Sequence, residues 1–386
     1  MASEPDLLAE LADQLHALDA DHLRRRRRIL STAQGPQVTV GERTLRNFCS
    51  NDYLGLANDP ILLAAAQDAM MQFGVGSGAS HLVCGHQQAH EALEQRFAGF
   101  VGQPAALLFG TGYLANLGVI PALLGRGDAV FADKLNHASL NEACLLSRAD
   151  FQRFPHNDCA ALARQLAASK ARRKLIAVDA VYSMDGDLAP LADLLQLAEQ
   201  HNAWLYVDDA HGFGVLGEGR GSLAHWQLSS PRLIYLATLG KAAGSAGALV
   251  GAHSVVIEWL LNKAKPAIYT TASPALLAAS AMAAIDIMEH EPGRRMRLVA
   301  HIARLRKGLA DLGDALLPSQ TPIQPLRMAS SAAAMQVSES LWDAGCWVAA
   351  IRPPTVATPR LRITVSASHS DDDIDALIDN LKPLLA

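Results

Sequence analysis

Between residues 105 and 252 the sequence repeats one pattern: a short apolar run, a polar or glycine-rich loop, and then a helix-length segment. The segments Ala160–Ser169 and Leu191–His201 have the length of such helices. The apolar runs predict strands at Ala105–Phe109, Ala129–Ala132, Lys174–Val178, Trp204–Val207, Leu233–Ala237 and Ala248–Val250. This alternation predicts an α/β fold, in which a mainly parallel sheet is sandwiched by helices on both faces.

The length of 386 residues indicates more than one structural domain. We expect an N-terminal helical arm over residues 1–50 and a large domain over 51–285 that holds the sheet. A smaller C-terminal α+β domain is expected over 286–386, with a helix at Leu298–Leu312 and a strand at Arg360–Val365.

The expected arm contains an amphipathic pattern over residues 4–30, with leucines at helical spacing, and includes the basic run Arg24–Arg28. A basic run can indicate nucleic-acid binding, but the formal net charge of −5 gives that interpretation no support. We therefore interpret the run as a solvated helix face with one arginine turned toward an anionic ligand.

Composition and apolar patterning favour a cytoplasmic protein without a membrane partner. The five cysteines are widely spaced and form no CxxC pair, which favours free thiols in a reducing compartment. No charged-then-apolar leader is recognisable. The most apolar segment, Ala275–Met288, is short and carries Asp286, so we predict a buried helix there and not a membrane span.

Three histidines and a cysteine cluster at His81, Cys84, His86 and His90, directly after a glycine-rich loop over residues 74–80. Such clustering can indicate a metal site. The spacing matches no standard zinc pattern, however, and His90 is placed to begin a helix. We therefore expect no metal.

Several residues with reactive or anion-binding potential follow the predicted strands. The carboxyl ends of parallel strands meet at one edge of a sheet, so these residues are expected to lie together. The turn over residues 110–116 opens a helix whose free N–H groups suit a phosphate. His137, Asp208 and His211 follow other strands, and Lys241 lies in a glycine-rich turn. Each residue alone could equally be a cap or a surface residue; their convergence favours pyridoxal 5′-phosphate, which needs a lysine, a strand-end carboxylate and a phosphate site.

Nine segments, in order along the chain, resemble the α-oxoamine synthases, which are pyridoxal-phosphate enzymes of the aspartate-aminotransferase fold (fold type I). The resemblance extends from about Leu23 to Ile378. The segments are NDYLGL, GSGAS, GTGYLAN, NHASL, VYSMDGD, VDDAHGFGV, TLGKAAG, IYTTASP and IRPPTV.

The resemblance implies a role for each matching residue. Lys241 would bind the cofactor covalently and later move the substrate α-proton, and His137 would stack over the ring and assist catalysis. Asp208 would pair with the pyridine nitrogen. The remaining implied cofactor contacts are Ser183 and His211 near the phenolic oxygen, Gly112, Tyr113 and Thr238 at the phosphate, and Thr270 and Thr271 from a partner subunit. The implied substrate contacts are Arg352 at the amino-acid carboxylate, Asn51 and Thr355 nearby, and Arg27 at the acyl group.

The implied reaction is a decarboxylative condensation of an amino acid with an acyl thioester, carried out by a homodimer with shared active sites. The IRPPTV segment favours L-alanine and a pimeloyl thioester, carried by coenzyme A or by an acyl carrier protein. Within the family, the alternative is an enzyme that condenses glycine with acetyl-CoA. The alternative that is not an enzyme is a catalytically silent regulatory subunit. His81, Ala242–Ala243 and the short loop Pro353–Pro359 depart from the family pattern and bear on acyl specificity.

Overall fold

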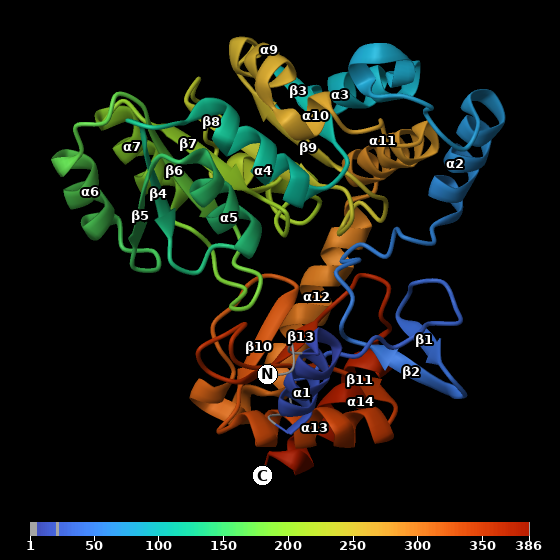
Figure 1. Ribbon diagram of the computed structural model, residues 1–386. Helices are drawn as coiled ribbons and strands as arrows, with labels where there is room; N and C mark the ends of the chain where they lie inside the picture. Colours follow the sequence, from blue (N-terminus) through green and yellow to red (C-terminus); the bar gives the residue numbers. More distant parts are fainter. Residues whose placement is uncertain (1–5, 21–22, 386) are drawn as a thin grey trace.

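A seven-stranded sheet forms the centre of the upper part of the molecule (Figure 1). The structure is a computed structural model that describes residues 6–20 and 23–385. Strand β9 is antiparallel to both of its neighbours, and the other neighbouring strands pair in parallel. In spatial order the strands are β3 (Ala105–Phe109), β9 (Ala248–Ala252), β8 (Leu233–Thr238), β7 (Trp204–Asp208), β6 (Lys174–Asp179), β4 (Ala129–Asp133) and β5 (Asp150–Phe154). The predicted α/β fold is confirmed.

Helices cover both faces of this sheet, because the central strands are apolar on both sides. One face packs against α4 (Gly112–Leu123), α5 (Ala138–Ser147), α9 (Ser254–Lys263) and α10 (Lys265–Ile268). The other face packs against α3 (Gln88–Val101), α6 (Cys159–Ala168), α7 (Leu191–Gln200) and α11 (Ala275–His290). Shorter or peripheral elements are α2 (Pro60–Phe73), the π-helix η1 (His81–Gly85), the 3-10 helix η2 (Gly217–Gly219) and α8 (Ser222–His225).

The C-terminal part and a hairpin from the N-terminal part form the lower half of Figure 1. One sheet has the order β10 (Ile323–Arg327), β13 (Arg360–Thr364), β12 (Ala349–Ile351). The other has the order β1 (Gln37–Val40), β2 (Arg43–Asn47), β11 (Cys346–Trp347). The helices here are α12 (Pro292–Gly308), α13 (Ser331–Asp343), α14 (Asp371–Leu381), η3 (Ala310–Ala315) and η4 (Lys382–Leu384). Since β2 pairs with β11, segments 300 residues apart in the sequence share a sheet. The domain boundaries at residues 50 and 285 stay a prediction.

The N-terminal helix is shorter than predicted. Helix α1 covers Leu7–Ala20, and residues 23–30 contain no helix, so the predicted extension to residue 30 is wrong there. The amides of Leu23 and Arg24 both donate to the carbonyl oxygen of Leu18, which closes the helix. Further along, the guanidinium of Arg28 lies 3.8 Å from the ring centroid of Trp342 and fixes the chain against α13. Residues 4, 5, 21 and 22 lie outside the described part.

The apolar segment around residue 280 is the buried helix α11, as predicted, and no helix among the described residues is long and apolar enough to cross a membrane. The helix predicted at 298–312 covers Pro292–Gly308: it begins earlier, because proline suits a first helical turn, and it ends four residues before the predicted end. Strand β5 was not predicted. It is an edge strand with half-exposed polar residues, so it lacks the apolar run that marks its neighbours.

Candidate active site

A cavity of about 310 Å³ opens at the carboxyl ends of the parallel strands. The turns that follow β3, β4, β6, β7 and β8 all contribute to its wall, as the strand-end argument predicts. Eight of the residues singled out from the sequence line it: Gly112, Tyr113, His137, Ser183, Asp208, His211, Thr238 and Lys241. The structure therefore brings most of the predicted cofactor contacts to one place.

Lys241 lies in the turn between β8 and β9, with its side chain at the cavity. The turn is tight because the Gly244 amide donates to the Lys241 carbonyl oxygen, and Gly244 has φ +63°. A Cβ at Gly244 would lie 2.4 Å from the Ala57 nitrogen, so only glycine fits. Burial lowers the pKa of Lys241, against the opposing charges of Asp208 and Asp179. A lysine with a lowered pKa suits a covalent bond to a carbonyl compound.

Asp208 ends β7 and is buried at 6% exposure. Its Oδ2 accepts a 2.8 Å hydrogen bond from the Asn116 side-chain amide, and its Oδ1 accepts from the Ala210 amide at 3.1 Å. Asn116 in turn accepts from the Tyr206 hydroxyl at 2.7 Å and donates to Ser139 at 2.9 Å. This network fixes the carboxylate in one orientation, which is what a partner for a protonated ring nitrogen requires.

The N-terminus of α4 and Thr238 form a narrow cradle. Thr111 caps α4 by accepting a hydrogen bond from the Leu114 amide at 3.1 Å. A Cβ added to Gly112 would lie 2.5 Å from Thr238 Cγ2. The space between the start of α4 and the end of β8 therefore depends on glycine at this position. Free amides at a helix start, a neighbouring hydroxyl and this space fit a phosphate group. Together with Lys241 and Asp208, the residues present fit pyridoxal phosphate.

The two histidines at the cavity are held by different partners. His137 caps α5, and its amide donates to Asp179 Oδ2 at 2.7 Å. Burial lowers the pKa of His137 against the charge of Asp208, so a neutral ring is favoured. The Nδ1 atom of His211 lies 2.6 Å from the Tyr53 hydroxyl, and burial lowers the pKa of His211 well below its usual range.

Arg362 is a buried arginine near the cavity that the sequence reasoning missed. Its Nε donates to the Ser183 carbonyl oxygen at 2.6 Å, and its Nη2 donates to Asn51 Oδ1 at 3.2 Å. Asn51 and Lys241 line a second opening of about 450 Å³. The positive charge of Arg362 also lowers the pKa of Lys241, after burial. Asn116, Asp179 and Tyr53 were missed as well; a strand-end carboxylate was the available signal for Asp179.

The remaining predicted substrate contacts lie elsewhere. Arg352 and Thr355 line a separate cavity of about 820 Å³ together with Arg24 and Arg25, and Arg352 Nη1 is buried without a hydrogen-bond partner. Arg27 lines neither this cavity nor the one at Lys241.

The segment predicted to serve a partner subunit does not line the Lys241 cavity of its own chain. Thr271 forms an isolated bridge with Ser80, and Thr270 is exposed. Their role toward a partner subunit stays a prediction.

Sheet topology, the lysine turn and the anion cradle define a pyridoxal-phosphate enzyme of fold type I, and residues 43–381 match the family described as "Aminotransferase class I and II", to which the chain belongs. Its relatives include 8-amino-7-oxononanoate synthase from Herminiimonas arsenicoxydans, 55% identical over 96% of this chain and 98% of the relative.

Two solved structures are similar over most of the chain. One is a serine palmitoyltransferase from S. paucimobilis with a bound PLP–myriocin adduct, with TM-score 0.92, 28% identity and 98% coverage of each chain. The other is 8-amino-7-oxononanoate synthase from Francisella tularensis, with TM-score 0.76 and 28% identity over 88% of this chain and 97% of that one. The cofactor of this fold is pyridoxal phosphate.

Proposed function

We propose that this chain condenses L-alanine with a pimeloyl thioester to give 8-amino-7-oxononanoate, carbon dioxide and the free thiol, as a step of biotin synthesis. The observation that carries the proposal is the set of relatives with that name at 52–56% identity over nearly the whole chain. The lysine, carboxylate and anion cradle at one cavity supply the matching equipment. We place the reaction in the cytoplasm.

Pyridoxal phosphate, when bound, supplies an electron sink that stabilises negative charge on the α-carbon of the amino acid. Lys241 holds the cofactor and moves the α-proton through its Nζ. Asp208 accepts a hydrogen bond from the ring nitrogen, and the α4 amides with Thr238 hold the phosphate. His137 hydrogen-bonds the acyl carbonyl oxygen and the departing carboxylate. Ser183 and His211 contact the phenolic oxygen.

Two arginines are candidates for the carboxylate of alanine. Arg352 was predicted from the sequence, and it has a free buried nitrogen. Arg362 lies against Ser183 and Asn51, on the Lys241 side of the molecule. We propose Arg362 for the amino-acid carboxylate and Arg352 for the distal carboxylate of the pimeloyl chain, since Arg352, Arg24 and Arg25 gather positive charge around one cavity.

Kinetics of two variants test this division. Loss of a charge-assisted bidentate contact costs roughly 2–3 kcal/mol, or about 30- to 150-fold. Arg362→Gln is expected to raise the KM for alanine by that factor and to leave the KM for the thioester within about threefold. Arg352→Gln is expected to do the reverse. The opposite pattern would reinstate Arg352 as the carboxylate partner of alanine.

We propose a homodimer in which Thr270 and Thr271 reach the phosphate of the partner's cofactor. Both are exposed, on a segment held by the Ala272 amide donating to the Ala79 carbonyl oxygen. Mixing a Lys241→Ala chain with a Thr271→Val chain tests sharing: hybrid dimers regain one intact site if the threonine acts across the interface. No regain would place Thr271 outside the partner's site.

Substrate identity is tested by condensation assays on the holoenzyme with L-alanine and pimeloyl-CoA or the carrier-protein thioester, and with glycine and acetyl-CoA. We expect the alanine–pimeloyl pair to be preferred and Lys241→Ala to be inactive with every pair. Preference for glycine and acetyl-CoA would make the chain a glycine C-acetyltransferase. If the protein did not bind pyridoxal phosphate, the interpretation as a catalytically silent regulatory subunit would be favoured.

A further inference from the structure

A further cavity, of about 490 Å³, lies between η1, α3, β3, α9 and α10, and Lys241 does not line it. Its wall is mostly apolar, with Leu107, Leu108 and Ile257 among its residues. Two histidines and three carboxylates also line this cavity: His81, His86, Glu91, Glu94 and Glu258. The mechanism above uses none of them.

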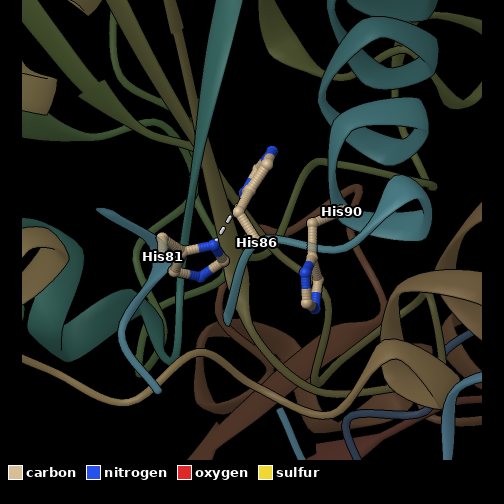
Figure 2. A group of neighbouring side chains, drawn as sticks. All are labelled: His81, His86 and His90. Atoms are coloured by element: carbon tan, nitrogen blue, oxygen red, sulfur yellow. Dashed lines mark hydrogen bonds between the residues drawn. The ribbon is translucent and has the colours of Figure 1, made fainter. Parts of the chain in front are cut away.

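The local backbone brings the histidines together. The Gly85 amide donates to the Ser80 carbonyl oxygen, which closes the five-residue π-turn η1 between His81 and His86. A Cβ at Gly85 would lie 2.0 Å from the Ala79 carbonyl oxygen, so this tight turn depends on glycine. As a result His81 Nδ1 lies 2.8 Å from His86 Nδ1, the contact drawn in Figure 2.

The third histidine in Figure 2 is engaged elsewhere. His90 Nδ1 accepts from the Gln87 amide at 3.0 Å in the capping box of α3. His90 Nε2 donates a hydrogen bond to the Ser273 carbonyl oxygen at 2.8 Å. Both ring nitrogens are thereby used, and the ring is fully buried. His90 therefore holds the fold and has no lone pair free for a metal ion.

The carboxylates of Glu91 and Glu94 are better placed than His90 to bind a metal ion together with His86. Glu91 and Glu94 are three positions apart on α3, which puts them on one helix face. The ligand atoms of His86, Glu91 and Glu94 all lie within 4.8 Å of one another. Each carboxylate has one oxygen held by a neighbour: Gln95 donates to Glu91 Oε1 at 2.7 Å, and the Leu108 amide donates to Glu94 Oε1 at 2.7 Å. These neighbours leave the second oxygen of each carboxylate free, and that of Glu91 faces His86 Nε2.

The spacing of one pair of ligand atoms matches the coordination shell of a single ion. His86 Nε2 lies 3.2 Å from Glu91 Oε2. Two ligand atoms at the usual zinc distances of about 2.0–2.2 Å, and at angles between octahedral and tetrahedral, are roughly 2.8–3.6 Å apart. A divalent ion could replace the proton between these two atoms without moving either side chain far. If His86 Nε2 is the ligand atom, its Nδ1–H donates to His81 Nδ1, the kind of outer contact that orients metal-bound histidines.

We propose that this chain binds a divalent transition-metal ion, with Zn²⁺ as the representative, through His86 Nε2 and the carboxylates of Glu91 and Glu94, and that His81 orients His86. An imidazole ligand favours Zn²⁺ over Mg²⁺, which prefers oxygen ligands throughout. With both carboxylates ionised and the imidazole neutral, the three ligands carry net negative charge in a mostly apolar wall, which favours a cation.

The experiment titrates Zn²⁺, and separately Mg²⁺, into EDTA-treated holoenzyme by calorimetry, with visible absorption of Co²⁺ as a second signal. Wild type is expected to bind one Zn²⁺ per chain and no Mg²⁺ at that site. His86→Ala, Glu91→Gln and Glu94→Gln are each expected to weaken Zn²⁺ binding at least tenfold. His81→Ala is expected to weaken it about 10- to 100-fold, the range for outer-contact changes.

His16→Ala removes an exposed histidine of α1 and is the matched control, expected to bind as wild type does. Far-ultraviolet circular dichroism and cofactor absorbance confirm that each variant is folded holoenzyme. Glu91→Gln keeps the size of the side chain, so it tests the site even if His86→Ala disturbs the turn. Absence of stoichiometric Zn²⁺ binding by wild type, or wild-type affinity in both His86→Ala and Glu91→Gln, would overturn the proposal.

Discussion

His156 lies between two carboxylates, and this arrangement predicts how the free energy of unfolding depends on pH. Its Nδ1 is 3.1 Å from Asp133 Oδ1, and its Nε2 is 2.7 Å from Asp187 Oδ2. Burial of the ring opposes its charge, but the hydrogen bonds to Asp133 and Asp187 outweigh burial and raise the pKa of His156 to about 10. The imidazolium therefore joins the end of β4 to the loop that carries Ser183.

The magnitude follows from the shift. A rise from 6.5 to about 10 corresponds to at most roughly 5 kcal/mol, at about 1.4 kcal/mol per pH unit. The His156 side chain is 27% exposed, and solvent screening reduces the effect to about half of that bound. Because the folded-state pKa is raised, this stabilisation is fully present below pH 6.5 and is lost as the pH rises toward 10. We expect His156→Gln to lower the free energy of unfolding by about 2 kcal/mol at pH 7 and by a few tenths at pH 10.

The assay is urea unfolding of the holoenzyme at both pH values, followed by tryptophan fluorescence. His225→Gln, at an exposed histidine outside the ion pairs, serves as the control and is expected to unfold like wild type at both pH values. A difference between wild type and His156→Gln that is equal at pH 7 and pH 10, or larger at pH 10, would refute the ion-pair reasoning.

Two further substitutions probe the cofactor site. Gly112→Ala places a Cβ 2.5 Å from Thr238 Cγ2, so we expect at least a tenfold loss of pyridoxal-phosphate affinity in an absorbance titration; unchanged affinity would mean that Thr238 does not bound the cradle. Asn116→Leu removes a donor to Asp208 and the acceptor of the buried Tyr206 hydroxyl, which at about 1–3 kcal/mol per unsatisfied group predicts roughly 2–4 kcal/mol of destabilisation. A free energy of unfolding of Asn116→Leu within about 1 kcal/mol of the wild-type value would show that the neighbouring groups find other hydrogen-bond partners.

The fold was predictable wherever the pattern is local. Apolar runs and the loops after them located six of the seven strands of the large sheet, and the strand-end rule then placed Lys241, Asp208 and Gly112 around one cavity. Strand β5 escaped because an edge strand with the sequence Asp-Phe-Gln-Arg-Phe has polar residues where central strands have apolar ones. The pairing of β2 with β11 joins residues 300 positions apart, and no local signal encodes such a contact.

The candidate site was predictable to the extent that its residues lie in turns. Arg362 was missed because it lies inside β13, where its neighbours Leu361 and Ile363 read as an ordinary strand. Asn116 was missed as a functional contact because it lies in an otherwise apolar helix. Its partner Asp208 is 92 positions away in the sequence. The histidine cluster was judged by its spacing and by the place of His90 at a helix start, whereas the carboxylates that we propose as further ligands, Glu91 and Glu94, lie on α3.

The contacts of Gly186 limit where this chain could be divided to build a hybrid enzyme. Its carbonyl oxygen accepts hydrogen bonds from Ser319 at 2.9 Å and Thr321 at 3.0 Å, and a Cβ there would lie 2.5 Å from the Ile323 carbonyl oxygen. Nearby, Arg360 pairs with Asp185 at 2.5 Å. A graft of a foreign C-terminal part, made to change the acyl chain accepted, would therefore have to carry the loop from Tyr182 to Asp187 with it. Exchanged without that loop, the graft would disturb the backbone that carries Ser183.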